Sequence, residues 1–172
     1  TSHSLGTYES PYPTLALAQA NSGAGDIIYV FPGDGTTTGM DAGIILKYNQ
    51  KFWGSGIAHS IRTSQGNIII PAHSSTLPKM TNISGNGITL ASINEVSGIT
   101  LTDVSDNGIF GTNLRNIDIS NCTIDNSTSD HIHLEYSCGQ GNLSLNNLTL
   151  VNGQLKAISI DATSSSMICD VK

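Results

Sequence analysis

The sequence predicts an all-β chain built as a parallel β-helix, a solenoid of stacked coils. The first observation is a recurring phrase, in which a small or polar pair precedes isoleucine, any residue and usually a second apolar residue. The leading isoleucines are 20 to 26 residues apart, at Ile44, Ile68, Ile88, Ile109, Ile132 and Ile158. A strand-like unit that recurs at this period is typical of solenoids, in which no single unit can bury its apolar face alone.

Composition is the second observation, and it excludes some classes of partner. Hydrophobic residues make up 38% of the chain, but charged residues only 12%, against about 25% in an average soluble domain. Ile, Thr, Ser, Asn and Gly fill the difference, which favours strands and tight turns. The net charge of −6 argues against nucleic acid and anionic membrane surfaces, because both attract basic patches. No apolar run is long enough for a transmembrane segment.

The three cysteines do not form a recognisable framework. Cys122, Cys138 and Cys169 are an odd number, and none of them belongs to a Cys-x-x-Cys motif, so neither a set of disulfides nor a zinc site is indicated. Two arrangements stay open, which are one disulfide with a free thiol and three buried thiols.

The N-terminal segment, residues 1–25, differs from the coils predicted for residues 26–172. Good helix formers at residues 15–20 follow Pro13 and end before the Asn-Ser-Gly sequence at residues 21–23. An open solenoid end would expose core residues and unpaired backbone groups. We therefore expect residues 13–21 to form a helix that caps the first coil.

Alternation of apolar and polar residues predicts the stacked columns of the coils, because side chains on a strand alternate between two faces. The leading isoleucines form one predicted column. The second column is Leu46, Ile70, Leu90, Gly111, Leu134 and Ile160, and a third, half a coil out of step, is Ile99, Ile117 and Leu148.

Asparagine and aspartate are predicted at the corners, because they tolerate left-handed backbone and bond their own turns. The predicted corner columns are Asn86, Asn107 and Asp130, and Asp103, Asn121 and Asn152. The wider gap between residues 132 and 158 predicts a longer loop with residues 138–141 at its tip.

A family resemblance rests on residues 15–56. The capping-helix residues, then Gly25-Asp26-Ile27-Ile28-Tyr29-Val30-Phe31-Pro32-Gly33, then the Gly-Ser-Gly at residues 54–56, resemble the opening of right-handed parallel β-helix proteins of the pectin-lyase-like group. Residues 26–94 also resemble autotransporter-passenger-type surface proteins of chlamydia-related bacteria. The resemblance implies that the parallel β-helix is right-handed. It also implies that the protein lies at the cell surface or outside the cell, in association with a bacterial outer membrane.

The favoured function is non-enzymatic: an adhesin-like or scaffold module that presents its loops to a partner. That partner is a host or cell-surface protein or a glycan, and no cofactor is expected. We expect the chain to be the first part of a longer solenoid, whose uncapped C-terminal coil could make end-to-end contacts. A purely structural spacer is a third possibility.

The rival function is a carbohydrate-active enzyme, a polyuronate lyase or hydrolase, or a carbohydrate-binding domain. Acidic residues are concentrated between residues 103 and 135, and glycosidases usually cleave their substrates with a pair of carboxylic acid side chains. The first residues to test are Asp103, Asp106, Asp125, Asp130 and His133. A lyase would also need a basic group to polarise the uronate, and the only arginines are Arg62 and Arg115.

The sequence also offers candidate ligands for a metal ion. His131 and His133 are two residues apart on a predicted strand, so both are expected to point outward, about 7 Å apart. With Glu135 or Asp130 they could bind a transition metal. Cys122 is expected to be a buried thiol and Trp53 to pack within a coil or under the cap.

Overall fold

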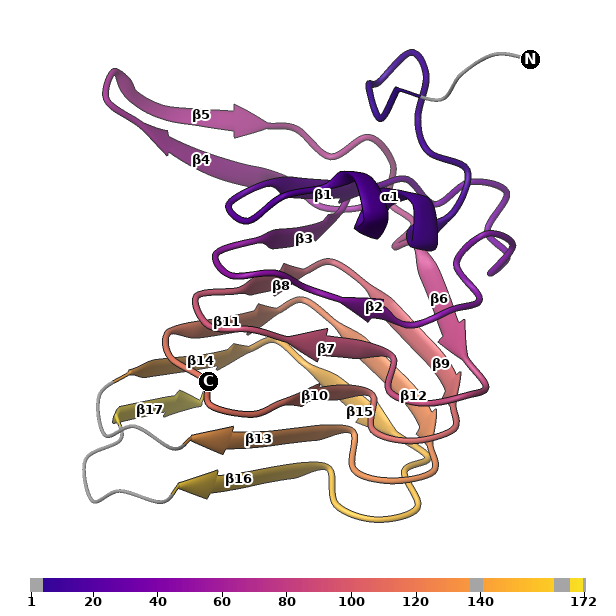
Figure 1. Cartoon of the computed structure of the whole chain (residues 1–172), viewed down its shortest axis with the longest axis vertical. Helices are drawn as coiled ribbons and strands as arrows, with labels where there is room; N and C mark the ends of the chain where they lie inside the picture. The colour runs from indigo at the N-terminus through magenta and orange to yellow at the C-terminus, as the bar shows by residue number, and fades with distance from the viewer. Residues whose placement is uncertain (1–4, 137–140, 163–167, 172) are drawn as a thin grey trace.

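The computed structural model describes residues 5–136, 141–162 and 168–171, with the side chains of residues 136, 162 and 168–171 left aside. Strands stack coil upon coil into a parallel β-solenoid, with one short helix near the N-terminus (Figure 1). The predicted all-β parallel β-helix with a capping helix is confirmed.

Three parallel sheets form the walls of the solenoid. The six-stranded sheet contains, in spatial order, β1 (Ile27–Val30), β3 (Lys51–Gly54), β8 (Glu95–Ser97), β11 (Ile117–Ser120), β14 (Asn142–Asn146) and β17 (Ile168–Val171). The five-stranded sheet contains β16 (Ile158–Ala162), β13 (Ile132–Tyr136), β10 (Ile109–Gly111), β7 (Ile88–Leu90) and β2 (Ile44–Ile45). The four-stranded sheet contains β15 (Thr149–Val151), β12 (Thr123–Ser127), β9 (Thr100–Val104) and β6 (Lys79–Asn82).

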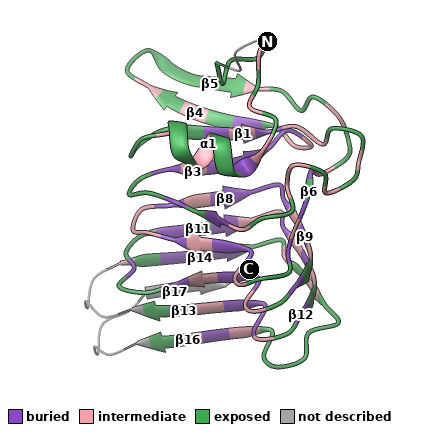
Figure 2. Cartoon of the chain, turned by 45° about the vertical axis from the view of Figure 1, so that its right-hand side comes forward, coloured by how far each residue is buried: buried purple, intermediate pink, exposed green. Residues whose placement is uncertain are grey.

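Aliphatic side chains from all three sheets fill the interior. Figure 2 marks the buried residues in purple along the strands. Within each strand, burial alternates: Ile117 and Ile119 of β11 are buried, whereas Asp118 between them is exposed. This alternation follows from the two-residue period of a strand, which sends successive side chains to opposite faces. The inward positions make the core, and the outward positions are free to carry function.

The leading-isoleucine column is confirmed in five of its six members. Ile44 pairs with Ile88, which pairs with Ile109, then Ile132, then Ile158. The second column is also present, with Leu90, Gly111, Leu134 and Ile160 in register.

Ile68 and Ile70 were placed wrongly. They belong to β5 (Gly66–Ile70), which pairs antiparallel with β4 (His59–Thr63) in a hairpin that joins none of the three sheets. Ile68 is 54% exposed, whereas its supposed neighbour Ile88 is fully buried. The antiparallel hairpin, here called the arm, projects beside the first coil (Figure 1).

The third predicted column was partly wrong. Thr100, Thr123 and Thr149 are in register. The residues that precede them therefore stack in one column, which is Ile99, Cys122 and Leu148. Ile117 instead lies in the six-stranded sheet and pairs with Leu143. The two sheets carry similar alternating phrases, and the sequence alone did not distinguish them.

The predicted corner residues Asp103, Asn121 and Asn152 adopt the left-handed backbone, but they belong to two different corners, and Asn86, Asn107 and Asp130 do not adopt it. Asp103, Asn126 and Asn152 form one level, with φ of 52°, 61° and 55°. Asn126 Nδ2 donates to Asp103 Oδ1 at 2.6 Å. Asn121 belongs to another corner, where Asn147 Nδ2 donates to Asn121 Oδ1 at 2.8 Å.

The other predicted corner column is confirmed through backbone bonds. Asn107 N–H donates to Asn86 Oδ1 at 3.2 Å, and Asp130 N–H donates to Asn107 Oδ1, also at 3.2 Å. Lys156 N–H continues the column by donating to Asp130 Oδ1 at 2.9 Å. Each side chain thus satisfies a backbone donor of the coil stacked on it.

The predicted cap is helix α1 (Leu15–Asn21), which begins after Thr14. Thr14 Oγ1 accepts a hydrogen bond from Leu17 N–H at 3.2 Å, as an N-cap residue does. Gln19 Oε1 accepts from Ile45 N–H of β2, and Lys47 Nζ donates to the helix carbonyls of Gln19 and Ser22. The helix therefore supplies partners to the open edge of the five-stranded sheet. The expected loop tip at residues 138–141 lies almost wholly outside the described residues.

Candidate functional site

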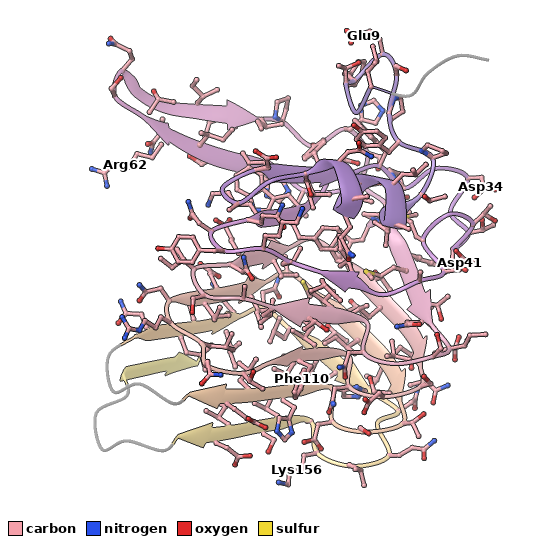
Figure 3. The ribbon with its side chains drawn as sticks, viewed as in Figure 1. Glu9, Asp34, Asp41, Arg62, Phe110 and Lys156 are labelled. Carbon is pink, nitrogen blue, oxygen red and sulfur yellow. The ribbon has the colours of Figure 1, made fainter. Side chains whose placement is uncertain are left out.

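The outer face of the five-stranded sheet brings together three of the candidate residues that the sequence indicated, Asp130, His133 and Glu135. Inward Ile and Leu alternate with outward residues, and the register places Thr89, Phe110, His133 and Ser159 in one outward column. Glu135 and Asp161 are paired two residues further along the strands. Figure 3 labels Phe110 and Lys156 on this part of the molecule.

His133 is the centre of this face. Its Nδ1 lies 3.0 Å from Asp130 Oδ2, and its Nε2 lies 3.5 Å from Glu135 Oε1 and 3.6 Å from Asp161 Oδ2. The side chain is 24% exposed, and the Phe110 ring lies beside it with centroids 5.7 Å apart. One imidazole thus contacts three carboxylates from two coils.

Asp130 is the buried member of the cluster. Burial alone would raise the pKa of this carboxyl, but hydrogen bonds from Lys156 N–H and His133, with the positive charges of both side chains, hold the pKa below its usual value. Asp130 is therefore a carboxylate at neutral pH that orients the His133 ring. Lys156 Nζ reaches Ser159 Oγ at 3.2 Å, so a cation also stands at this face.

This arrangement can accept hydrogen bonds from the hydroxyl groups of a ligand. In residues 5–136, 141–162 and 168–171, no group of three or more metal-ligating side chains is placed to hold an ion. Of the weak metal candidates, His133 and Glu135 come together, and His131 does not join them.

His131 was predicted to point outward, and that prediction was wrong. The residue is 2% exposed, and its Nδ1 lies 3.0 Å from Ser127 Oγ inside the corner. Burial lowers the pKa of its imidazole, only partly opposed by a bond to the Val151 carbonyl and by the charge of Asp125. It precedes the leading isoleucine, at the position that Gly87 and Gly108 occupy in earlier coils.

The residue before the leading isoleucine is closely packed by the neighbouring coils, so a side chain at this position points into the corner and not to solvent. A Cβ on Gly108 would lie 2.6 Å from the His131 carbonyl oxygen and 2.6 Å from Ile124 Cγ2. The His131 ring fits only because Gly153 covers it in the next coil, where a Cβ would lie 2.7 Å from Nε2.

The other three acidic candidates do not join His133. Asp103 Oδ1 accepts from Asn126, and Asp125 Oδ1 accepts from Asn152 at 2.8 Å, so both belong to the corner after the four-stranded sheet. Asp106 follows the same corner, and its Oδ1 accepts from Asn107 Nδ2 at 3.2 Å. These acids accept hydrogen bonds from asparagine side chains at the turns.

A second polar cluster was not predicted. On the outer face of the six-stranded sheet, Glu95 accepts from Trp53 Nε1 at 2.9 Å and forms an ion pair with Lys51. Lys51 Nζ lies 5.1 Å from the centre of the Trp53 ring, and Asp118 is in register with Glu95. Partial burial and the charge of Glu95 raise the pKa of Asp118, against opposing effects of Ser144 and Lys51.

The sequence did not indicate this cluster, because the arm is inserted between its members. Lys51 and Glu95 are 44 residues apart in the sequence, and their pairing follows only once the arm is recognised as an insertion within one coil. Trp53 was expected to pack within a coil or under the cap. It is fully buried, but on the outer face of the sheet, where the His59 ring stacks on it with centroids 4.5 Å apart.

A cavity of about 1040 Å³ opens beside the cap. Residues 5–14, helix α1 and β1 line it, and its aromatic members include Tyr8, Tyr29 and Phe31. Tyr8 and Tyr29 both meet Phe31 edge to face, with centroids 5.7 and 5.3 Å away. The core residues Ile28 and Val30 form its floor, so the cavity marks the end of the solenoid interior.

Cys122 is a buried thiol, as predicted. It is 1% exposed, and burial raises the pKa of its thiol to about 11. Cys138 lies outside the described residues, as does the side chain of Cys169, so the predicted alternatives for these two cysteines stay open.

The fold and the face define the chain as a parallel β-solenoid with a polar, partly aromatic outer surface. Among the described residues, no helix is long and apolar enough to cross a membrane. Comparisons with protein-family models, curated proteins and solved structures found no match.

Proposed function

We propose that this protein is a non-enzymatic binding module whose five-stranded outer face binds a glycan. The observation that carries the proposal is the cluster in which Phe110, three carboxylates and Lys156 surround His133 on an outward sheet face. The solenoid acts as a stiff scaffold, because each outward residue is fixed by the inward residues on either side of it.

The chemistry of the face suits a sugar ring. The Phe110 ring can pack against the C–H groups of a pyranose, and the carboxylates of Glu135 and Asp161 can accept hydrogen bonds from its hydroxyls. Glu135 and Asp161 are 48% and 64% exposed, so both reach solvent. Stacked strands repeat about every 4.8 Å, so the face offers these contacts in a row that an extended chain of sugars could follow.

The charge of the face favours a neutral or basic glycan over a polyuronate. Three carboxylates, at Asp130, Glu135 and Asp161, stand against the single cation Lys156. Each uronate would bring a further negative charge within a few ångströms of these carboxylates, and like charges at such distances repel. Arg62 lies in the arm and Arg115 between β10 and β11, so neither supplies the basic group of a lyase. A polyuronate lyase or hydrolase is therefore the less supported function.

We also propose that the module acts at a cell surface or outside the cell. The supporting observation is the resemblance of residues 15–56 to the opening of pectin-lyase-like proteins, together with the resemblance of residues 26–94 to autotransporter passengers. The predicted bacterial outer-membrane association rests on the second resemblance.

The test is binding to immobilised neutral, amino-sugar and uronate polysaccharides, compared between the native chain and single variants. We expect Phe110→Ala to weaken binding at least about tenfold, which corresponds to about 1.4 kcal/mol. Tyr48→Ala, which removes an exposed aromatic ring outside the strands of this sheet, is the matched control and should change affinity less than about twofold. Binding to none of the neutral or basic glycans, or binding that Phe110→Ala leaves unchanged, would refute the proposal. Release of reducing sugars would refute its non-enzymatic part.

A further inference from the structure

The arm formed by β4 and β5 has no partner strand among the described residues. The two strands pair with each other from His59↔Ile70 to Thr63↔Gly66 and form a sheet of their own. Both outer edges are therefore open, and Ile68 and Ile69 are 54% and 61% exposed. An isolated two-stranded hairpin is at best marginally stable in water, so this arm gains stability if another surface covers it.

The root of the arm is firmly held. His59 is 6% exposed, its ring stacks on Trp53 with an interplanar angle of 9°, and its Nε2 lies 2.7 Å from the Gly54 carbonyl oxygen. The arm therefore leaves the solenoid in a defined direction, and Arg62 stands near its tip (Figure 3). A fixed, partly apolar projection is suited to docking, because little conformational entropy is lost when it binds.

The charges of the chain are separated along the sequence. Residues 42–94 contain four basic residues, Lys47, Lys51, Arg62 and Lys79, and no Asp or Glu. Residues 95–172 contain nine acidic residues and three basic ones. Within the arm, residues 59–70, the only charged side chain is Arg62, whereas the corner after the four-stranded sheet carries Asp103, Asp106 and Asp125, so a second copy of this chain offers Arg62 a complementary surface.

A receiving surface exists at the corner that follows the four-stranded sheet. This acidic corner combines exposed apolar side chains with carboxylates, and its members are Ile83, Asp103, Asp106, Asp125, Val151 and Leu155. Ile83 and Leu155 are 80% and 68% exposed. The corner spans the three steps from β6 to β15, about 14 Å at the usual strand spacing, and the five residues of β5 extend about 17 Å.

We propose that the arm of one copy docks on the acidic corner of a second copy through the face that carries both Ile69 and Arg62, with Ile69 against the apolar side chains of the corner and Arg62 against its carboxylates. If each copy gives and receives one arm, the contact closes as a two-fold dimer. The contact borders the His133 face at Leu155, next to Lys156, and includes none of Phe110, His133, Glu135 and Asp161.

The test is the molar mass in solution, measured by light scattering and sedimentation from low to high micromolar chain concentration. The native chain should reach twice its own 18.0 kDa. The double variant Ile68→Thr/Ile69→Thr, and separately Arg62→Glu, should stay at the monomer mass. Ile45→Thr is the matched control, because Ile45 is 59% exposed on β2 and lies outside both surfaces. Far-UV circular dichroism with native strand content confirms that each variant is folded.

The corner is tested separately with Asp106→Lys/Leu155→Ser, which should also give the monomer mass. Mixing this variant with Arg62→Glu should not recover a full dimer, because each mixed pair can form one arm contact at most. A native chain that is monomeric at every concentration overturns the proposal. A dimer that the arm variants leave intact overturns the role of the arm, and one that the corner variant leaves intact overturns the receiving surface.

Discussion

Replacing Ile109 and Ile68 by alanine, one at a time, tests the coil assignment directly. Both isoleucines head the same recurring phrase and are equivalent by sequence. In the structure, Ile109 is fully buried and stacked between Ile88 and Ile132, whereas Ile68 is 54% exposed in the arm. The two substitutions remove the same atoms from very different surroundings.

The expected losses in the free energy of unfolding differ several-fold between the two variants. A buried Ile→Ala change removes transfer free energy and leaves a cavity, at a cost of about 2–5 kcal/mol. At position 109 the stacked coils on both sides restrict collapse around the cavity, so a loss of about 3 kcal/mol is expected. An exposed position away from the core changes stability by about 0.5 kcal/mol or less. For a chain of this length, 1 kcal/mol shifts the melting temperature by about 2–4 °C. Ile109→Ala should therefore melt about 6–12 °C lower, and Ile68→Ala about 2 °C lower at most.

Thermal unfolding can be followed by the fluorescence of Trp53, which is fully buried at the first coils and reports their opening. The chain concentration should be kept in the monomer range, so that any loss of dimer at Ile68 does not add to the measured change. Ile83→Ala serves as a control for an exposed isoleucine outside the recurring phrase. Equal losses at positions 68 and 109 would refute the assignment of β5 to a separate arm.

Three further predictions concern the corner and the titrating groups. Gly153→Ala should cost about 1–3 kcal/mol by displacing the His131 ring, and His131→Ala in the same chain should recover part of the loss; additive losses in thermal unfolding would argue against this contact. Asp130→Asn should lower stability above pH 3.8, and the difference from the native chain should vanish as pH falls through the depressed pKa of the folded state; a difference independent of pH in acid titration would contradict the cause given for that pKa. Cys122 should resist alkylation in the folded chain at about pH 8, because its pKa is about 11, and should react after unfolding; site-resolved mass spectrometry that finds native modification would disprove its burial.

The coils were predictable because their signal is repeated and local. Five stacked isoleucines head strands whose alternation is readable in each coil, so Ile88, Ile109 and Ile132 could be aligned without a structure. Ile68 could not be separated from them, because its phrase has the same alternation. Ile44 and Ile88 are 44 residues apart, close to two coil lengths, so an arm inserted into one coil leaves the apparent period unchanged. Only strand pairing, which depends on distant residues, distinguishes the two cases.

The candidate site was predictable in part for the same reason. Asp130, His133 and Glu135 come from one strand and its turn, so sequence proximity brought them together. Asp161 joins them from the next coil, through a register that the predicted column of Ile132 and Ile158 already contained. The burial of His131 was missed, because the inward tilt of that corner depends on Ser127 and on the glycine that covers the ring.

The two proposals assign different properties to the two surfaces: glycan affinity to the His133 face and self-association to the arm. Phe110→Ala should weaken glycan binding without changing the molar mass, because Phe110 lies outside the arm and the acidic corner. The Ile68→Thr/Ile69→Thr variant should bind a short soluble oligosaccharide as the native chain does, because its His133 face is intact.

On a dense immobilised glycan the same variant should bind more weakly, since a dimer that engages two sugars gains from effective concentration and a monomer does not. Equal binding to the dense surface would show that self-association contributes nothing to recognition. Weaker binding of the short oligosaccharide would instead show that the arm belongs to the glycan site itself.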